Sequence, residues 1–388
     1  MLNDIGSALR LRQIVALTLA VGVVAACQGG ASDAVGGGGL ANVNTKITLV
    51  AYSVPEPGWS KVIPAFNASE RGKGVQLITS YGASADQSRG VVEGKPADIV
   101  NFSAEPDITR LVKAGKVSAD WDKEATKGIP FGSVVTLMVR KGNPKNIRDW
   151  DDLLRPGVEV ITPSPLSSGS AKWNLLAPSA AKSGGGRDSR AGIDFISNLV
   201  HEHVKLRPGS GRVATAVFVE GSGDVLISYE NEAIAAERQG KSVEHVIPPQ
   251  TFKIENPVAV VSTSPHLDVA TAFKNLQYTA AAQKLWAQAG FRPVDPAVAT
   301  DFRDQYPVPV KLWTIADLGG WSTADPQLFD KNTGSITRST CRRPDDGRDY
   351  SGSGGDPPRA RPARQSTSGA AGKRARPAGR VSRHFGSV

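Results

Sequence analysis

The stretch GVQLITSYGASADQSRGVVEG, residues 74–94, decides the fold class of this chain. Residues 74–82 predict a strand that ends at Gly82, and residues 84–94 predict a helix. The same order, a strand and then a helix, occurs on both sides of this stretch, in 46–52 with 59–69 and in 97–103 with 105–115. Strands that alternate with helices are typical of a parallel sheet, and they predict an α/β fold.

A second series of elements follows the first. Strands are predicted over 133–142, 157–165, 243–249 and 256–263, helices over 147–154, 170–182, 192–202 and 213–221, a strand that turns into a helix over 224–240, and one long helix over 269–290. A chain of 388 residues suits two domains. We expect a first lobe from 46–132 and 250–337 and a second lobe from 133–249, because the last two strands can return the chain to the first sheet.

The N-terminus has the features of an exported lipoprotein. Two arginines precede residues 14–26, an apolar run that is too short to span a bilayer comfortably. The run ends in small residues before Cys27, which resembles a bacterial lipobox and implies cleavage before Cys27 and diacylation of its thiol. An ordinary signal peptide with an incidental cysteine is the alternative. We predict a lipoprotein signal peptide over 1–27, a flexible tether over 28–45, and a lipid anchor on the outer face of the cell membrane.

The net charge of +9 does not predict a nucleic-acid partner, because the basic excess lies at the end of the chain. Residues 341–388 contain eleven Lys and Arg against four Asp, so the body of the protein is nearly neutral. Residues 338–388 are rich in Arg, Pro, Gly and Ser and predict a disordered basic tail. A frameshift in GC-rich DNA gives a similar composition and is a second hypothesis for this segment. If Cys27 is lipidated, Cys341 has no cysteine with which to pair.

Three loops that join a strand to a helix are candidates for an anion site. They are Tyr81–Ser84, Ser168–Ser170 and Pro208–Arg212, and each contains serine and glycine. The first backbone N–H groups of a helix have no partner within the helix and carry a partial positive charge. Glycine or serine at such a start allows an anion to approach the backbone closely. A serine before a helix is also a common N-cap, so the prediction depends on the three loops converging.

Other chemistries have little support in the sequence. His201 and His203 lack further metal ligands, and Gly240-Lys241-Ser242 follows a predicted helix where a P-loop would precede one. There is no Gly-x-Ser-x-Gly motif. We expect no catalytic residue, metal or cofactor; an anion-ester hydrolase with Ser84 or Ser168 as nucleophile is the alternative from another class. The remaining candidates are expected to have structural roles. Glu230 and Glu232 are expected on a helix surface. The core or a domain edge is expected for Trp59, Trp173 and Tyr229.

Four segments resemble the sulfate-binding proteins of ABC-type sulfate and thiosulfate importers. They are TSYGASADQSRGVVEGKPADIV (79–100), VRKGNPKNIRDWDDLLRPGVEVITPSPLSSGSAKWN (139–174), FVEGSGDVLISYENEA (218–233) and LWTIADLGGWSTADPQLFDKNTGSI (312–336). The resemblance runs from about Ile47 to Ile336. It implies the bilobed type II periplasmic-binding-protein fold, with two parallel-sheet-based lobes, a ligand cleft between them, and a dianion held mostly by backbone N–H groups.

The resemblance also implies which residues hold the anion. The family's serine hydroxyl falls on Ser84, and the donor of its third loop falls on Gly211, with Arg212 behind the site. The family's tryptophan N–H donor is replaced by Tyr229, whose hydroxyl can donate but can also accept. The family's first-loop aspartate, a backbone donor, is replaced by Ser53. The family's Ser-Gly-Gly donors fall on Ser168, Gly169 and Ser170.

The donor set favours sulfate over phosphate. Sulfate carries no proton at pH 7, whereas phosphate keeps one and needs an acceptor. None of the matched positions is Asp or Glu, although Glu56, Asp86 and Glu230 lie close in sequence. Thiosulfate, molybdate and phosphate remain alternative ligands. We therefore expect a non-enzymatic, monomeric sulfate receptor that delivers its ligand to the transmembrane permease subunits of an ABC importer, which a cytoplasmic ATPase drives.

Overall fold

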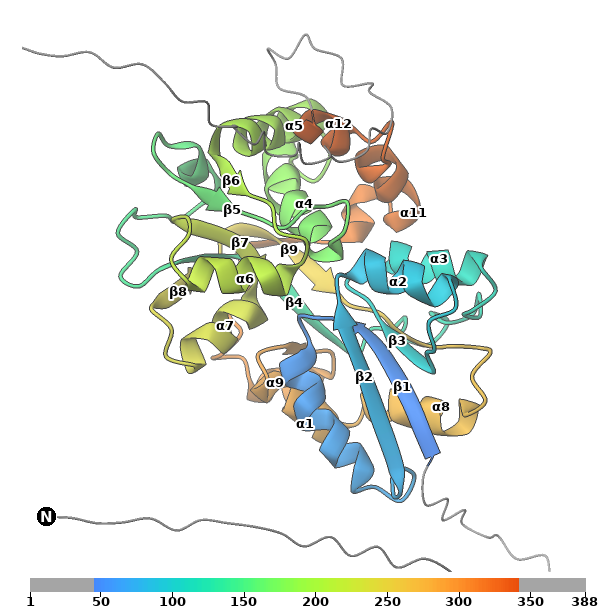
Figure 1. Cartoon of the computed structure of the whole chain (residues 1–388). Coiled ribbons are helices and arrows are strands. Elements are labelled where there is room, and N and C mark those ends of the chain that lie inside the picture. The colour runs from blue at the N-terminus through green and yellow to red at the C-terminus, as the bar shows by residue number, and fades with distance from the viewer. Residues whose placement is uncertain (1–44, 342–388) are drawn as a thin grey trace, which may run out of the picture.

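The structure is a computed structural model, and it describes residues 45–341. A four-stranded sheet has the order β10-β3-β1-β2. Strands β1, β2 and β3 are parallel, and β10 is antiparallel to β3. The strands are β1 (Thr45–Tyr52), β2 (Val75–Gly82), β3 (Ile99–Asn101) and β10 (Val258–Val260), and the helices around them are α1 (Glu56–Asn67), α2 (Ser84–Val92), α3 (Glu105–Lys113) and α8 (Leu267–Leu276) (Figure 1).

An eight-stranded sheet forms the second part of the molecule, with the order β12-β9-β4-β7-β5-β6 and with β8 and β11 paired to β4. Strands β5, β6 and β7 are parallel, and β4 is antiparallel to its neighbours. The strands are β4 (Phe131–Arg140), β5 (Val160–Ile161), β6 (Val204–Leu206), β7 (Val225–Tyr229), β8 (Val243–Val246), β9 (Gln250–Glu255), β11 (Arg292–Pro293) and β12 (Lys311–Trp313).

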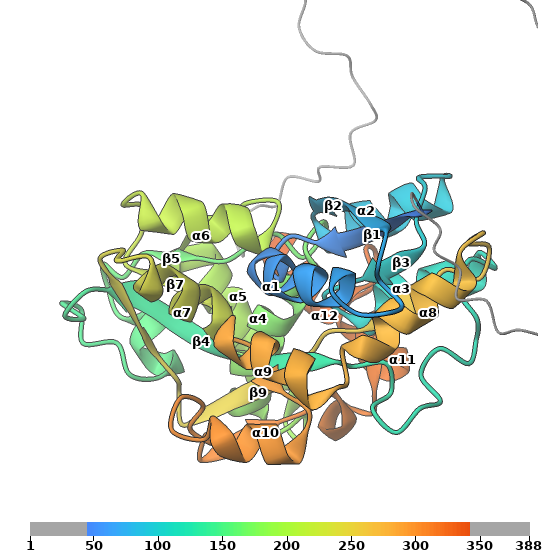
Figure 2. The same ribbon diagram turned by 90° about the horizontal axis from the view of Figure 1, so that it is seen from below.

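Helices cover both faces of this second sheet, with α4 and α5 on one side and α6 and α7 on the other (Figure 1). The helices are α4 (Gly169–Ser183), α5 (Ser189–Asn198), α6 (Gly211–Val219), α7 (Glu230–Arg238), α9 (Ala280–Gln288), α10 (Pro296–Asp301), α11 (Trp321–Ala324) and α12 (Ser335–Cys341). Short 3-10 helices span Trp150–Leu154 and Ile315–Leu318, and short π-helices span Leu199–His203 and Asp325–Phe329. Figure 2 shows the same two parts from below. The predicted α/β class and its strand–helix order are confirmed.

Strands β6, β11 and β12 were not predicted, and two further details of the predicted element order are wrong. The single helix expected over 269–290 is two helices, because Gln277–Thr279 form a turn and the Thr279 hydroxyl caps α9 by accepting from the Ala282 N–H at 3.3 Å. Strand β9 was not predicted, because exposed polar residues interrupt its buried positions.

Strand pairing also changes the expected division into lobes. Residues 250–337 were all expected in the first lobe; of this segment, β10 and α8 pack with the first sheet and α9 packs on α1. Strand β9 pairs with the start of β4 while β8 pairs with its end, so both extend the second sheet. Strand β12 then pairs with β9, and α12 packs on α5.

The terminal predictions fall largely outside the described residues. The predicted signal peptide, Cys27 and the tether up to residue 44 lie outside them, as does the predicted tail from residue 342. Residues 338–341, which were expected in the disordered tail, belong to α12. Within 45–341, none of the helices has the length and apolar character to cross a membrane.

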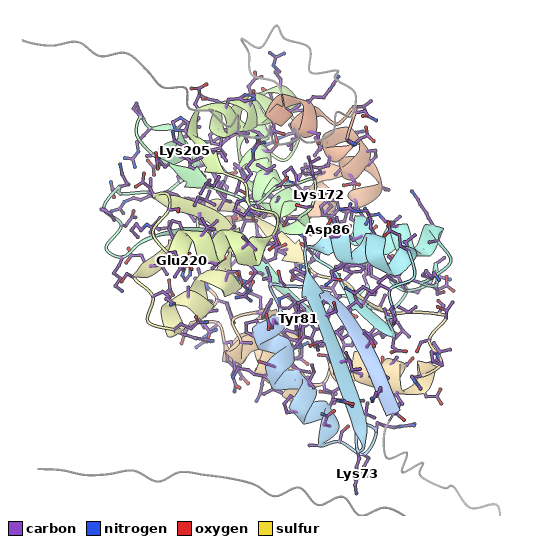
Figure 3. The ribbon with its side chains drawn as sticks, in the orientation of Figure 1. Lys73, Tyr81, Asp86, Lys172, Lys205 and Glu220 are labelled. Carbon is purple, nitrogen blue, oxygen red and sulfur yellow. The ribbon has the colours of Figure 1, made fainter. Side chains whose placement is uncertain are left out.

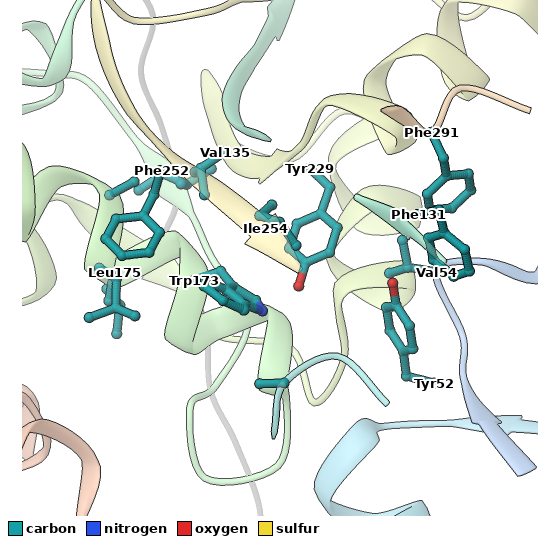
Figure 4. Packing of buried hydrophobic residues seen from close by; sticks show 14 of the residues in the cluster. Tyr52, Val54, Phe131, Val135, Trp173, Leu175, Tyr229, Phe252, Ile254 and Phe291 are labelled. Atoms are coloured by element: carbon teal, nitrogen blue, oxygen red, sulfur yellow. The ribbon is translucent and has the colours of Figure 1, made fainter. Parts of the chain in front are cut away.

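Aromatic side chains dominate the core. Trp286 stacks on Phe131 at 3.8 Å between ring centres and meets Trp59 edge-on at 4.9 Å. A continuous cluster runs from Phe131 and Phe291 through Ile254 to Trp173 and Phe252, with Tyr229 between its ends (Figure 4). Trp59, Trp173 and Tyr229 are thus core residues, as expected. This core fixes the relative positions of the loops at the junction between the two sheets.

Candidate anion-binding site

The first turns of three helices lie against one another. A Cβ added to Gly169, the first residue of α4, would lie 2.7 Å from the Ser103 Cβ and 3.3 Å from the Ser84 Cβ at the start of α2. A Cβ added to Gly211, the first residue of α6, would lie 3.1 Å from the Ser170 Oγ and from the Val54 Cγ2. The structure therefore brings the three predicted loops together, and the two glycines permit this close approach.

Several backbone donors are free where these helices meet. Among residues 45–341, no hydrogen-bond partner accepts from the N–H groups of Gly169, Ser170 and Gly211. The Ala85 N–H of α2 donates to the Ser167 carbonyl at 3.2 Å, and so joins α2 to the loop before α4. Free N–H groups at the starts of aligned helices are an anion-binding arrangement that uses no formal charge.

The two serines with expected roles differ in what their hydroxyls do. The Ser84 hydroxyl donates to Asp107 Oδ2 at 2.5 Å and accepts from the Ser103 N–H at 3.0 Å, so its hydrogen is not free for an anion. The expected hydroxyl role of Ser84 does not fit this geometry, while its backbone N–H at the start of α2 has no hydrogen-bond partner among the described residues. Ser168 was expected to donate through its backbone, but its N–H donates to the Ser164 carbonyl at 2.9 Å. Ser168 is buried, and its hydroxyl makes no hydrogen bond with the described residues, so this hydroxyl is free to donate.

The first loop also differs from the expectation. The Ser53 N–H donates to the Gly82 carbonyl at 3.0 Å, because the pairing of β1 with β2 continues one residue past the strands. The Ser53 backbone donor is therefore occupied. The next residue, Val54, is buried, has no hydrogen-bond partner for its N–H among the described residues, and lies against Gly211. In this loop, the backbone donor that is free is therefore Val54 and not Ser53.

Arg212 lies behind the loops, as expected. Its Nη2 donates to the Val54 carbonyl at 2.9 Å and lies 3.1 Å from Glu232 Oε1. Glu232 was expected on a helix surface, but it is buried and lines a pocket with Ser170, Gly211 and other residues. Burial raises the pKa of the Glu232 carboxyl, and the nearby Arg212 opposes this rise. The sequence did contain a signal for this position. Glu232 lies three residues after Tyr229, which places it in the first turn of α7, next to the site.

Glu230 is also buried, contrary to the expectation of a surface position. Arg292 donates to its two oxygens at 2.6 and 2.8 Å, so this carboxylate is fully paired. Glu230 therefore offers no acceptor to a ligand in the pocket.

Tyr229 ends β7, and its hydroxyl lies 2.7 Å from the Ser103 Oγ. Burial raises the pKa of the Tyr229 phenol well above its usual range, although Ser103, Ser170 and Asn256 lower it. The hydroxyl therefore keeps its proton and can donate it. Ser103 was not predicted as part of the site, and its only signal is its position at the carboxyl end of the strand predicted over 97–103.

Catalytic and metal-binding alternatives find no support in the described residues. Within 45–341, no three His, Cys, Asp or Glu side chains are arranged to hold a metal ion. The hydroxyl of Ser84 faces the carboxylate of Asp107 and the N–H of Ser103, and no histidine approaches it. Charged side chains flank the junction instead, with Asp86 on α2 and Lys172 on α4 (Figure 3), and Lys172 forms an ion pair with Asp325.

A two-lobed α/β fold with free backbone donors gathered at the lobe junction is typical of ligand-binding receptors. Residues 47–292 match the family model of bacterial extracellular solute-binding proteins, and the chain belongs to this family. It is 81% identical to the solved structure of the sulfate-binding protein SubI from Mycobacterium tuberculosis H37Rv, with a TM-score of 0.73 over 74% of this chain and 100% of that one.

Two curated relatives also align with most of this chain and with most of their own length. The sulfate-binding protein of Synechococcus elongatus is 36% identical over 80% of this chain and 91% of its own length. The thiosulfate-binding protein of Pseudomonas aeruginosa is 33% identical over 75% of this chain and 91% of its own length. These similarities confirm the resemblance to sulfate-binding proteins of ABC-type importers and the type II periplasmic-binding-protein fold.

Proposed function

We propose that this chain is an extracytoplasmic receptor that captures sulfate and delivers it to an ABC importer. The observation on which this rests is the meeting of α2, α4 and α6 at free N–H groups. Asp107 accepts from Ser84 and Arg110, and the charge of Glu232 is balanced by Arg212 at 3.1 Å, although neither Glu232 oxygen has a hydrogen-bond partner among the described residues. A site of neutral donors suits a fully deprotonated dianion. The similarity to sulfate-binding proteins supports the same ligand.

In this proposal, the anion is held by backbone donors of Val54, Ser84, Gly169, Ser170 and Gly211 and by the hydroxyls of Ser168 and Tyr229. Closure of the lobes replaces the water shell of the anion with these fixed groups, and no catalytic residue is involved. The partners are the transmembrane permease subunits and their ATPase, and the receptor acts as a monomer. Thiosulfate, the ligand in the name of the Pseudomonas relative, is the second candidate.

Thermal unfolding with added anions tests the ligand. A ligand at about a hundred times its dissociation constant stabilises the folded state by about 2.7 kcal/mol, which raises Tm by several degrees. We expect this rise with sulfate, a smaller one with thiosulfate and little change with phosphate. A larger rise with phosphate would show an acceptor in the site, and no rise with any anion would contradict the receptor function.

We further propose that Cys27 carries the lipid that holds the receptor at the membrane. The expected result is that the protein sediments with the membrane fraction, and that Cys27→Ser moves it to the soluble fraction without changing its affinity for sulfate. Intact-mass measurement of the membrane form should show a chain that begins at residue 27 with added acyl groups. A wild-type chain that begins elsewhere and carries no acyl group would contradict the lipid anchor.

A further inference from the structure

We propose that Ser103 determines specificity in this site, because its hydroxyl donates to the Tyr229 hydroxyl and so fixes Tyr229 as a donor toward the anion. This inference rests on the proposed function. It concerns a residue that lies in the loop two residues after β3 of the first sheet, whereas Tyr229 ends a strand of the second sheet. The pair therefore also joins the two lobes beside the anion loops.

Ser103 contacts three elements of the site, which are α2, α4 and the end of β7. It is fully buried. Its N–H donates to the Ser84 Oγ at 3.0 Å, and its carbonyl accepts from Trp173 Nε1 at 2.7 Å and from Asn256 Nδ2 at 2.9 Å. Its Cβ is the atom nearest to the position that a Cβ on Gly169 would take. These contacts hold the Ser103 side chain in one place.

The surroundings of the two hydroxyls decide the direction of their hydrogen bond. At 2.7 Å, one of the two oxygens must accept from the other. The Ser103 hydroxyl has no other hydrogen-bond partner among the described residues, so its hydrogen is used only if it donates to Tyr229. The Tyr229 hydroxyl also neighbours Ser170 and Asn256, and Ser170 and Tyr229 line one pocket, so a Tyr229 hydrogen that is not used on Ser103 is free to point toward that pocket. The chain of donors runs from Ser103 to Tyr229 to the anion, and each bond in such a chain strengthens the next.

This arrangement determines which oxyanions fit. A free tyrosine hydroxyl both donates and accepts. Because the Tyr229 oxygen already accepts from Ser103, it offers no acceptor to a proton on the ligand. A protonated oxyanion such as hydrogen phosphate would therefore find no acceptor for its O–H at Tyr229, which costs binding energy. Ser103 in this way keeps the Tyr229 hydroxyl a donor toward the anion.

Calorimetric titration of the purified protein with sulfate and with inorganic phosphate at pH 7 tests the inference. In Ser103→Ala, sulfate binding is expected to weaken about tenfold, because the donor chain is shortened. Phosphate is expected to keep or gain affinity, because the Tyr229 oxygen becomes free to accept. The ratio of sulfate to phosphate affinity should fall at least about tenfold. In a Tyr229→Phe background, the same substitution should leave the ratio unchanged.

Ser88→Ala is the matched control. Ser88 is an equally buried serine that donates to the Asp107 carbonyl, and it does not contact Tyr229. This variant is expected to keep the wild-type ratio. Tyr229→Phe alone provides a second test if Ser103→Ala does not fold. Since Tyr229 donates to both anions, both affinities should fall by the same factor, and a ratio that rises instead would show that Tyr229 accepts from phosphate.

The outcomes separate the inference from the proposed function. A reduced ratio in Ser103→Ala, absent in the Tyr229→Phe background, supports the role of Ser103. An unchanged ratio in Ser103→Ala overturns that role while sulfate binding by the wild type leaves the receptor function intact. A wild-type protein that binds no sulfate overturns the proposed function and this inference with it.

Discussion

Gly169→Ala is expected to weaken sulfate binding by at least about a hundredfold. The added methyl group would lie 2.7 Å from the Ser103 Cβ and 3.3 Å from the Ser84 Cβ. Neither atom lies at the end of a flexible side chain, so the start of α4 must move away from α2. The free N–H groups of Gly169 and Ser170 would then no longer reach the anion together with those of the other loops. Isothermal titration with sulfate measures the loss.

This loss should occur without unfolding. Gly169 begins α4 without a positive φ, and alanine favours a helix more than glycine does. The Tm of the ligand-free variant should therefore stay close to that of the wild type. Gly209→Ala is the control, because its added methyl would lie 3.8 Å from the nearest atom, the Ser167 Oγ. Sulfate affinity in Gly169→Ala within about tenfold of the wild type would contradict the proposed position of the anion.

Trp286→Ala is expected to lower the free energy of unfolding by about 3–5 kcal/mol. Trp286 is fully buried, and its ring contacts Phe131, Phe291 and Trp59 with centre-to-centre distances of 3.8, 5.2 and 4.9 Å. Its Nε1 donates to Gln277 Oε1 at 3.0 Å, so the substitution also leaves a buried acceptor unpaired. Denaturant unfolding followed by circular dichroism measures the change.

The effect should be confined to stability. Trp286 lies on α9 and packs in the core against Trp59 of α1 rather than against the three anion loops, so the folded variant is expected to bind sulfate with wild-type affinity. Val308→Ala is the control, because Val308 is 84% exposed, and its effect should stay within about 0.5 kcal/mol. A loss below about 1 kcal/mol for Trp286→Ala would show that the aromatic cluster repacks around the cavity.

The local pattern of the chain was enough to predict most of the fold. Strand and helix positions follow from periodicity, and the structure confirms them from β1 to α7 with few changes. The positions where helices begin also follow from local signals, so the loops that contain Gly169 and Gly211 could be singled out before any tertiary contact was known, and the family resemblance then pointed to these two glycines as donors. These features depend on residues that are neighbours in sequence, and a helix start has free N–H groups whatever surrounds it.

Pairing between distant strands was not predictable in this way. Strand β9 has a mixed polar and apolar pattern, and it forms because β4 is a long buried strand with one edge still to be paired. The break between α8 and α9 depends on Gln277, whose side chain accepts from Trp286 in the core. Local sequence does not encode which edge or which buried partner is available.

The sequence alone determined that this chain is an α/β protein with three neutral, donor-rich loops, since glycine, serine and helix starts are local properties. Only the tertiary structure decided which donors are free. The Ser53 N–H is taken by Gly82, the Ser84 hydroxyl is taken by Asp107, and Ser103 and Glu232 enter the site from elsewhere in the chain. A hydrogen bond needs a donor and an acceptor. In these cases the two lie tens of residues apart along the chain, and only folding brings them together.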